Sequence, residues 1–521
     1  MNQEILALIK ERGLLMEKEV FDLVERISDP LLAKDFLERL ERSSGQKLLT
    51  KSSLTQHFSA VKGLVSHLPG EHRELIERTF VTLGVSVEIQ KEHEIVVKKE
   101  QENKMQSSTY QVYYASTKND KKLEVQDFTS YFRARYQQLQ KILLQRPDLP
   151  RLISINKISS DRQQVSIIGM VKDKRQTKNQ NLILTFEDLT GEISVLVKND
   201  HRELFAQALE LQLDDVVALK ASGNRDMLFV HDLYYPDAFL PEKTKFEEDI
   251  SIAFISDIHC GSDRHLSQSM GRFLDWLQTP DAAKIRYLFI TGDTVDGVGI
   301  FPGQESVLRL KSMKEQYALL ASYLQRVPSH ITMFLCPGQH DAVRVAEPQP
   351  IIGSGYAPAL HSMDNMVLVT NPSLVVLKEG QREFKVLMYH GASIHSFIHE
   401  IPELREMKAH KTPAKAVAHM LKRRHLAPTH SSAVYIPYAD KDPLVIAEVP
   451  DVLCTGEVHR LDIETYHGVL IITGSCWQAQ TPFEEKVGNI PDPAKVPVLN
   501  LKTRELKIYD FGVEEEIQRE Y

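Results

Sequence analysis

Five short apolar runs in the second half of the chain each end in side chains that can bind a metal ion, and no other feature constrains the fold as strongly. The runs are rich in β-branched and aromatic residues and have the length of buried strands. Patterns typical of helices, at 273–277 and 308–324, separate the first three runs. An α/β domain is therefore predicted, with the following side chains gathered at the carboxyl ends of its strands. They are Asp257 with His259, Asp293, Gln339-His340-Asp341, His390, and Glu457 with His459.

The length and composition limit the kinds of protein that this chain can be. A single core rarely grows beyond ~250–300 residues, so 521 residues predict several domains. The formal net charge of −8 provides no overall basic field, and any contact with nucleic acid must come from a local patch. The four cysteines form no CxxC pair, which argues against a zinc–thiolate site and indicates a reduced intracellular protein.

The sequence shows no signal for export or membrane insertion. The amino terminus does not resemble a signal peptide, and no apolar run approaches ~18 residues. We therefore expect a cytoplasmic protein without a membrane segment.

We predict four regions along the chain. Residues 1–95 carry apolar stripes at helical spacing and form a helical module, which either packs its own core or docks onto another protein. Residues 96–150 are a polar linker followed by a helix at 125–144. Residues 151–245 contain five short strands with a helix after the third, which is the element order of an OB-fold β-barrel. Residues 246–521 form the α/β domain that carries the five motifs.

A basic segment joins the first two strands of the predicted barrel. In an OB-fold this loop borders the oligonucleotide groove, so the segment is a candidate nucleic-acid contact. The alternative is a solvated loop on a packing module. The residues concerned are Lys172, Lys174, Arg175 and Lys178.

The five motifs also resemble a known signature. In order they are DxH, GD, GQHD, a single His and GExH, which is similar to the calcineurin-like metallophosphoesterases over about residues 250–480. The resemblance implies a two-sheet sandwich flanked by helices that binds two divalent metal ions. The first ion would be bound by Asp257, His259, Asp293 and His459, and the second by Asp293, Gln339, His390 and Glu457. It also implies that His340 stabilises the transition state or protonates the leaving oxygen, with Asp341 orienting its ring.

The chemistry of the ligands is consistent with this resemblance. A pair of cations suits phosphodiester cleavage, because the phosphate and the attacking oxygen are both anionic. Mixed imidazole and carboxylate ligands favour manganese, iron or zinc over magnesium.

Two positions depart from the family pattern. Gln339 stands in place of Asn, and Glu457 stands in place of the first His of GHxH. The added carboxylate favours a harder ion such as manganese or magnesium, and we expect manganese. Either departure could instead misplace the second ion, and an error of about 1 Å costs about 100-fold in rate.

Longer stretches are similar to the small subunits of archaeal family-D DNA polymerases, which share the order of helical module, OB-fold and phosphoesterase domain. They include PGQHDAVRVAEPQP at 337–350, VIAEVPDVLCTGEVH at 445–459 and CWQAQTPFE at 476–484. The resemblance implies a 3′→5′ exonuclease for single-stranded or mismatched DNA ends that binds a large catalytic polymerase subunit. Arg344 would lie near the site, where it either grips DNA or packs a loop. Residues 476–483 would lie on the surface, towards the large subunit.

Two other functions remain open at this point. The same subunit could be a noncatalytic scaffold whose second metal site is lost through Gln339 and Glu457. The second alternative is a free-standing phosphatase that acts on small molecules. The long amino-terminal half of the chain argues against this function.

Overall fold

The computed structural model describes residues 109–115, 117 and 122–517, together with positions 9, 13–17, 20, 21, 24, 34, 36–38, 41 and 47–49. The chain forms two compact units, Met1–Lys99 and Glu100–Tyr521. In the described part, no helix is long and apolar enough to cross a membrane. The four predicted regions divide the chain more finely than this and stay a prediction.

Little of the predicted helical module lies within the described residues. Val20 and Val24 are buried at helical positions, as their spacing predicts. Two short strands that the sequence pattern did not indicate, β1 (Leu15–Met16) and β2 (Leu48–Leu49), pair in parallel. The second apolar stripe of the module, at 54–68, lies outside the described residues.

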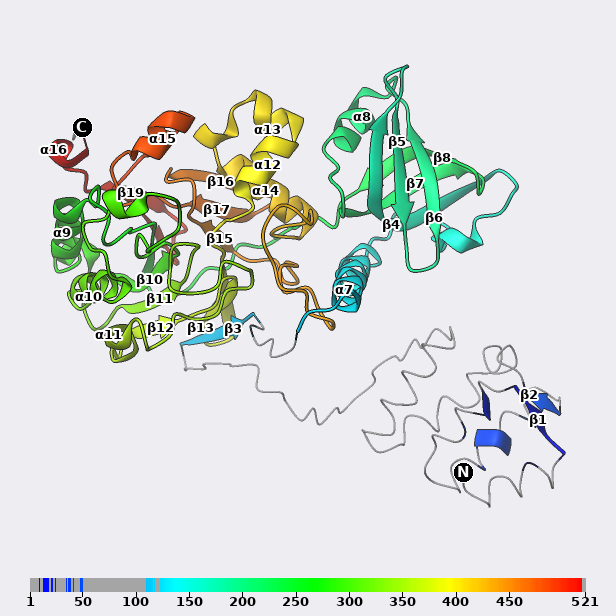
Figure 1. Ribbon diagram of the computed structural model, residues 1–521, viewed down its shortest axis with the longest axis horizontal. Helices are drawn as coiled ribbons and strands as arrows, with labels where there is room; N and C mark the ends of the chain where they lie inside the picture. The colour runs from blue at the N-terminus through cyan, green and yellow to red at the C-terminus, as the bar shows by residue number, and fades with distance from the viewer. Residues whose placement is uncertain are drawn as a thin grey trace. The chain divides into compact units, whose positions relative to one another are not determined.

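Two six-stranded sheets face each other in the second unit, with helices on both outer sides (Figure 1). The first sheet has the order β12-β11-β10-β9-β18-β19. Its strands are β9 (Ser251–Ser256), β10 (Ile285–Thr291), β11 (Thr332–Cys336), β12 (Met366–Leu368), β18 (Lys495–Asn500) and β19 (Leu506–Asp510). The second sheet has the order β16-β17-β15-β14-β13-β3. Its strands are β3 (Tyr110–Tyr114), β13 (Ser373–Glu379), β14 (Arg382–Met388), β15 (Val452–Thr455), β16 (Asp462–Tyr466) and β17 (Val469–Thr473).

The central strands are buried on both faces. Phe254, Phe289 and Phe334 of the first sheet pack between the sheets, with ring centroids 5.4 and 5.2 Å apart, in one core with Val386 and Cys454 of the second. Strands covered on both sides read as continuous apolar runs, which is why the five runs stand out in the sequence. The first sheet is covered by α9 (Ser267–Trp276), α10 (Met313–Leu324) and α11 (Pro358–His361). The second is covered by α12 (Ile394–Glu400), α13 (Pro402–Glu406) and α14 (Ala414–Arg423). The predicted two-sheet arrangement flanked by helices is therefore observed.

The predicted polar linker is wrong at one place. β3 lies within it and pairs antiparallel with β13 at the edge of the second sheet. Tyr110 and Val112 enter the core between the sheets, so their preference for a pleated, half-buried surface outweighs the polar residues around them. The helix predicted at 125–144 is α7 (Val125–Leu143).

The five predicted strands of the barrel form a closed sheet in the order β4-β5-β6-β8-β7. They are β4 (Gln163–Gln176), β5 (Leu182–Glu187), β6 (Glu192–Val197), β7 (Val216–Gly223) and β8 (Leu228–Tyr234). The helix α8 (Arg202–Leu209) follows the third strand, as predicted, and β6 pairs in parallel with β8. The helix α7 packs on the outside of the barrel, where the Tyr136 hydroxyl donates to the Ile168 carbonyl at 2.9 Å.

The basic loop predicted at 172–178 is largely a strand. A bulge between Val171 and Asp173 shifts the register, and β4 then continues beside β5 as far as Gln176. Only the turn from Thr177 to Asn181 joins the two strands. The sequence pattern predicts too short a strand because residues 172–176 are polar and show no alternation with apolar side chains.

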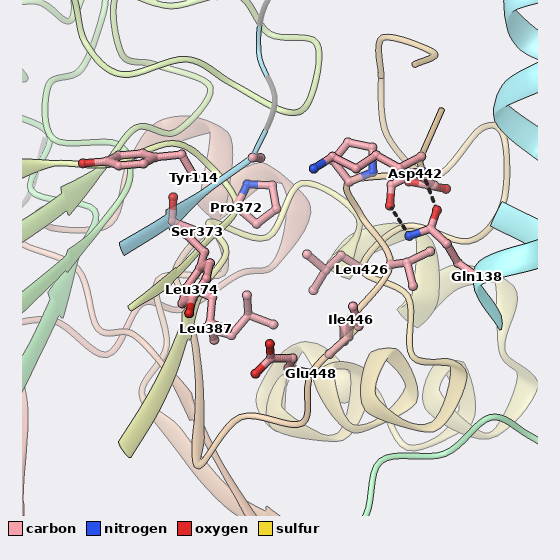
Figure 2. A pocket seen from close by; sticks show the side chains of 16 residues that line it. Tyr114, Gln138, Pro372, Ser373, Leu374, Leu387, Leu426, Asp442, Ile446 and Glu448 are labelled. Carbon is pink, nitrogen blue, oxygen red and sulfur yellow. Dashed lines mark hydrogen bonds between the residues drawn. The ribbon is translucent and has the colours of Figure 1, made fainter. Parts of the chain in front are cut away.

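A buried ionic cluster joins α7 to the segment 425–444; we call it the Arg135 cluster, and it comprises Tyr131, Arg135, His425 and Asp442. The Asp442 carboxylate accepts hydrogen bonds from Tyr131 (2.7 Å), Arg135 Nε (2.6 Å), His425 Nε2 (2.8 Å) and the Leu444 amide (2.9 Å). Beside it, Gln138 and the Asp442 backbone exchange two hydrogen bonds at the rim of a cavity of about 220 Å³ (Figure 2). Every acceptor position of this carboxylate is used.

Candidate metal centre

All five predicted motif loops begin at the carboxyl ends of central strands, and the two sheets bring these ends together. Asp257 and His259 follow β9, Asp293 follows β10, Gln339, His340 and Asp341 follow β11, His390 follows β14, and Glu457 and His459 follow β15. Contacts cross from one sheet to the other at this edge. The His390 Nδ1 atom lies 3.1 Å from the Thr291 carbonyl oxygen, and the Glu457 amide donates to Asp257 Oδ1 at 3.1 Å.

The backbone of these loops is strained. Five of the candidate ligands have positive φ, namely Asp257 (49°), His259 (50°), Asp293 (44°), Glu457 (74°) and His459 (57°). Such conformations cost on the order of 1–3 kcal/mol each outside glycine, and they gather at functional sites. The neighbouring glycines allow the close approach: a Cβ on Gly338 would lie 2.2 Å from Asp293 Oδ1, and one on Gly456 would lie 2.5 Å from Asp257 Oδ2.

One half of the site is a pair of histidines that face each other. The Nε2 atoms of His259 and His459 are 3.0 Å apart, and His459 Nε2 lies 3.6 Å from Asp257 Oδ1. Each Nδ1 atom lies 3.0 Å from a carboxylate, Asp296 for His259 and Glu484 for His459. These carboxylates favour a proton on Nδ1 and so leave both Nε2 lone pairs directed at the same space, as in histidines that bind a metal.

Asp296 and Glu484 were not predicted. Asp296 stands three residues after Asp293 in the same loop, and Glu484 ends the stretch CWQAQTPFE. Their positions in the sequence were a weak signal, because an isolated carboxylate shows no spacing that pairs it with a particular histidine. Both lie close to the site only through the tertiary fold.

The other half of the site surrounds His390. Its Nε2 atom lies 3.2 Å from Asp293 Oδ2 and 3.3 Å from Glu457 Oε2, while its Nδ1 faces the Thr291 carbonyl. Gln339 Nε2 donates to Glu457 Oε2 at 2.8 Å. The two residues that depart from the family pattern therefore contact each other.

Unsatisfied atoms mark the space between the two halves. Of the described residues, five have a buried side-chain polar atom without a hydrogen-bond partner, and three of these atoms are Asp257 Oδ2, Gln339 Oε1 and His390 Nε2. Leaving a buried polar group unpaired costs about 1–3 kcal/mol. All three atoms can donate a lone pair to a cation, so the donor set fits a metal centre of oxygen and nitrogen ligands.

The described residues contain three candidate groups of three ligands: one is His259, Asp296 and His340, and the other two share a residue. The ligand atoms of Asp257, His259 and His459 lie within 4.8 Å of one another, and so do those of Asp257, Asp293 and His390. Asp257 is thus common to both groups, whereas the family resemblance assigns the shared position to Asp293. The bridging role of Asp293 stays a prediction.

The histidines of the site stabilise two of its three carboxylates but leave Asp257 with a raised pKa. Burial raises the pKa of Asp257 in spite of His390 and His459 nearby. Burial also acts on Asp293, but His390 and His340 outweigh it and hold the pKa of that carboxyl well below its ordinary value. Burial is likewise outweighed at Glu457, where His390 lowers the pKa to about 2. Additional positive charge at this site would stabilise all three carboxylates.

The role predicted for Asp341 is wrong. Its carboxylate does not contact the His340 ring but accepts hydrogen bonds from Thr294, from the Tyr317 hydroxyl at 2.9 Å and from the Gly338 amide at 2.9 Å. The His340 ring is held instead by the Asp296 carbonyl, 2.6 Å from Nδ1. Asp341 therefore shapes the loop, because its short side chain reaches back to its own turn and to α10.

His340 stands at the edge of the site. Its amide donates to Asp293 Oδ1 at 2.8 Å, and its Nε2 atom lies 3.9 Å from Asp293 Oδ2. The side chain is 22% exposed. The ring can therefore reach a bound molecule from the open side of the site.

The predicted nucleic-acid contacts divide into two kinds. Lys172 pairs with Glu187 and Glu192, and Lys174 donates to the carbonyls of Leu209 (2.6 Å) and Leu211 (2.8 Å). Arg175 and Lys178 are exposed, so a DNA contact through them stays a prediction.

Two further surface predictions concern the loops around the site. Arg344 donates to the carbonyls of Ala346 (3.2 Å) and Pro348 (2.7 Å), which agrees with the loop-packing alternative. Residues 476–479 are not on the surface: Trp477 packs against Phe273 in the outer core of the first sheet. In this stretch Phe483 is exposed.

Comparison with known proteins identifies the class. Residues 252–461, which include the site loops, match the family model of the DNA polymerase alpha/epsilon B subunits. The part of the chain that carries the site is thus similar to DNA polymerase B subunits.

Several relatives share most of the chain. It is 38% identical over 402 residues to the DNA polymerase II small subunit of Pyrococcus furiosus, a match that covers 74% of this chain and 64% of that protein. It is 33% identical over 519 residues to the DNA polymerase II small subunit of Methanothermobacter thermautotrophicus, covering 98% of this chain and all of that one (100%). The chain belongs to the family of archaeal DNA polymerase II small subunits.

Three solved structures each match 16% of this chain. The S. pombe Stn1–Ten1 complex matches 16% of this chain with 18% sequence identity and a TM-score of 0.15, which carries no argument.

Proposed function

We propose that this polymerase small subunit is a metal-dependent 3′→5′ exonuclease that acts on single-stranded or mismatched DNA ends as the partner of a large catalytic subunit. The observation that carries the proposal is the convergence of Asp257, Asp293 and His390 at one edge of two sheets, where their ligand atoms lie within 4.8 Å of one another and Asp257 Oδ2 has no hydrogen-bond partner. The two-sheet sandwich and its motif order support membership of the calcineurin-like metallophosphoesterases.

The residues present fit two divalent cations, with manganese as the proposed ion. Asp257, His259 and His459 would hold one, His390, Gln339 and Glu457 the other, and Asp293 lies beside both sets. Bound there, such ions neutralise the phosphate and supply an activated water for attack on the phosphodiester bond.

The protein itself supplies positioning and a proton. Asp296 and Glu484 hold His259 and His459 in one orientation, so that neither ring has to reorganise when DNA binds. The contact between His340 Nδ1 and the Asp296 carbonyl leaves His340 Nε2 free at the open side. Burial lowers the pKa of His340, but Asp293 outweighs it and raises the value overall, which favours a protonated ring that can donate to the leaving 3′ oxygen.

One observation favours the noncatalytic alternative. The hydrogen bond of 2.8 Å between Gln339 Nε2 and Glu457 Oε2 uses one carboxylate oxygen that the second ion needs. In a scaffold protein this contact would replace the ion.

A manganese titration of 3′-end digestion tests the proposal. The full chain, alone and with the large subunit, is mixed with end-labelled single-stranded and mismatched DNA, with Asp293→Ala as the inactive control. Digestion by the wild type that requires manganese supports the exonuclease. If neither form digests DNA, but a Gln339→Asn, Glu457→His variant does, the scaffold function is correct.

A further inference from the structure

The loop from Gly297 to Gly303 exposes three apolar side chains beside the candidate centre. Val298 is 45% exposed, Ile300 40% and Phe301 43%. The loop contains no charged residue, and its three glycines, at 297, 299 and 303, have φ near 80°. Among the described residues, no ring contact involves Phe301. Exposed apolar side chains grouped in this way are typical of interaction surfaces.

The base of this loop is tied to the residues that would carry the chemistry. Gln304 Nε2 donates to the Asp296 carbonyl at 2.8 Å, and Gln304 Oε1 accepts from the Ile300 amide at 2.9 Å. The same Asp296 carbonyl contacts His340 Nδ1. A Cβ on Gly297 would lie 2.7 Å from the His340 carbonyl oxygen, so the two loops are in close contact.

We infer that the loop Gly297–Gly303 binds the unpaired nucleobases of a DNA 3′ end, with the Phe301 ring stacked on a base. This inference rests on the proposed function. A DNA strand whose phosphate lies at the metal centre places its terminal bases next to that centre, where the loop begins directly after Asp296. Apolar and aromatic side chains without charge suit the faces of bases and not the phosphates. The loop thereby selects frayed ends, since bases within a duplex have both faces stacked on their neighbours.

The test compares the loss of the ring with the loss of the base. Phe301→Ala, Phe301→Tyr and the control Phe239→Ala, whose ring is 65% exposed elsewhere, are prepared as full chains with the large subunit. Each is titrated with single-stranded DNA that has, or lacks, the two terminal 3′ bases. Binding is measured by fluorescence anisotropy without metal, and KM for digestion is measured with manganese.

The ring should matter only when the base is present. Phe301→Ala should weaken binding of intact ends about 5- to 150-fold, the range of one stacked base, and should leave abasic ends unchanged. Phe301→Tyr and Phe239→Ala should behave as the wild type. An equal loss on both kinds of DNA, no loss at all, or dissociation of the large subunit from the Phe301→Ala chain would overturn the inference.

The two proposals fail in different ways. If the wild type digests no DNA with manganese, the proposed exonuclease function is wrong. The binding measurement without metal then still decides whether the loop binds unpaired bases. If digestion occurs but Phe301→Ala binds intact ends normally, only the loop assignment is wrong.

Discussion

The Arg135 cluster and the candidate metal centre are both buried and charged, but they differ in how their polar atoms are satisfied. In the Arg135 cluster, the four acceptor positions of Asp442 all receive hydrogen bonds, and His425 Nδ1 accepts from the Ala427 amide at 3.0 Å. In the metal centre, Asp257, Gln339 and His390 each keep an unpaired atom, and the backbone is strained.

The difference separates a structural role from a functional one. A buried charge without partners is costly, so a cluster made for stability is expected to be complete. Under the proposed function, a metal ion from outside the chain would complete the candidate metal centre and offset this cost.

Loss of Asp293 should remove the chemistry but not the fold. In the Asp293→Ala chain we expect manganese-dependent DNA digestion to fall on the order of 10⁴-fold, at the upper end of what one catalytic group contributes. Metal-free stability should fall, because His390 and His340 stabilise this carboxylate in the folded chain, but by less than on loss of Arg135, because His390 keeps Glu457 beside its Nε2 atom. Digestion rates and thermal denaturation measure the two effects, with the exposed Asp275→Ala as the matched control. A large loss of metal-free stability would mean that the centre is structural.

Breaking the Arg135 cluster should have the opposite result. Arg135→Met leaves Asp442 as an uncompensated buried charge, which costs about 3–5 kcal/mol of the free energy of unfolding. Manganese affinity of the folded chain should not change, because the cluster does not contact the site. Chemical denaturation and metal titration test this pair of expectations. Unchanged stability would show that the cluster contributes nothing to the fold.

The Arg135 cluster should also make the fold sensitive to acid. Burial, with Arg135 nearby, lowers the pKa of His425 to about 4, below its unfolded value of about 6.5. The neutral ring is therefore the folded form, and its contribution is lost as the pH falls from about 6.5 to about 4, by up to about 3 kcal/mol. Relative to His425→Gln, which keeps a donor for Asp442, the wild type should lose stability over this interval. A difference that is constant with pH would refute the assignment.

Removing a carboxylate behind a ligand should have a smaller effect. Asp296→Asn keeps the size of the side chain but weakens its hold on His259, and metal affinity should fall about 10- to 100-fold. Calorimetric titration with manganese measures the change, with Asp275→Asn as the control. An unchanged affinity would show that His259 is not a ligand.

Elements with a local sequence pattern were predicted correctly, whereas elements that depend on partners distant in the sequence were missed. The central strands are continuous apolar runs and the barrel strands alternate between apolar and polar residues. Both patterns are local, so the order of these elements along the chain could be read from the sequence. β3 could not, because it forms a strand only by pairing with β13, more than 250 residues away in the sequence. Asp296 and Glu484 carry no spacing signal, and Asp341 stands next to His340 in the chain without touching its ring. The sequence pattern does not show in which direction these three side chains point in the folded chain.

The most direct test of the metal centre is a manganese titration of the full chain followed by electron paramagnetic resonance. Two ions per chain with a spin-coupled signal, lost in Asp293→Ala, are the predicted result. If the wild type binds no more manganese than the Asp293→Ala chain does, there is no two-metal centre at this edge of the sheets.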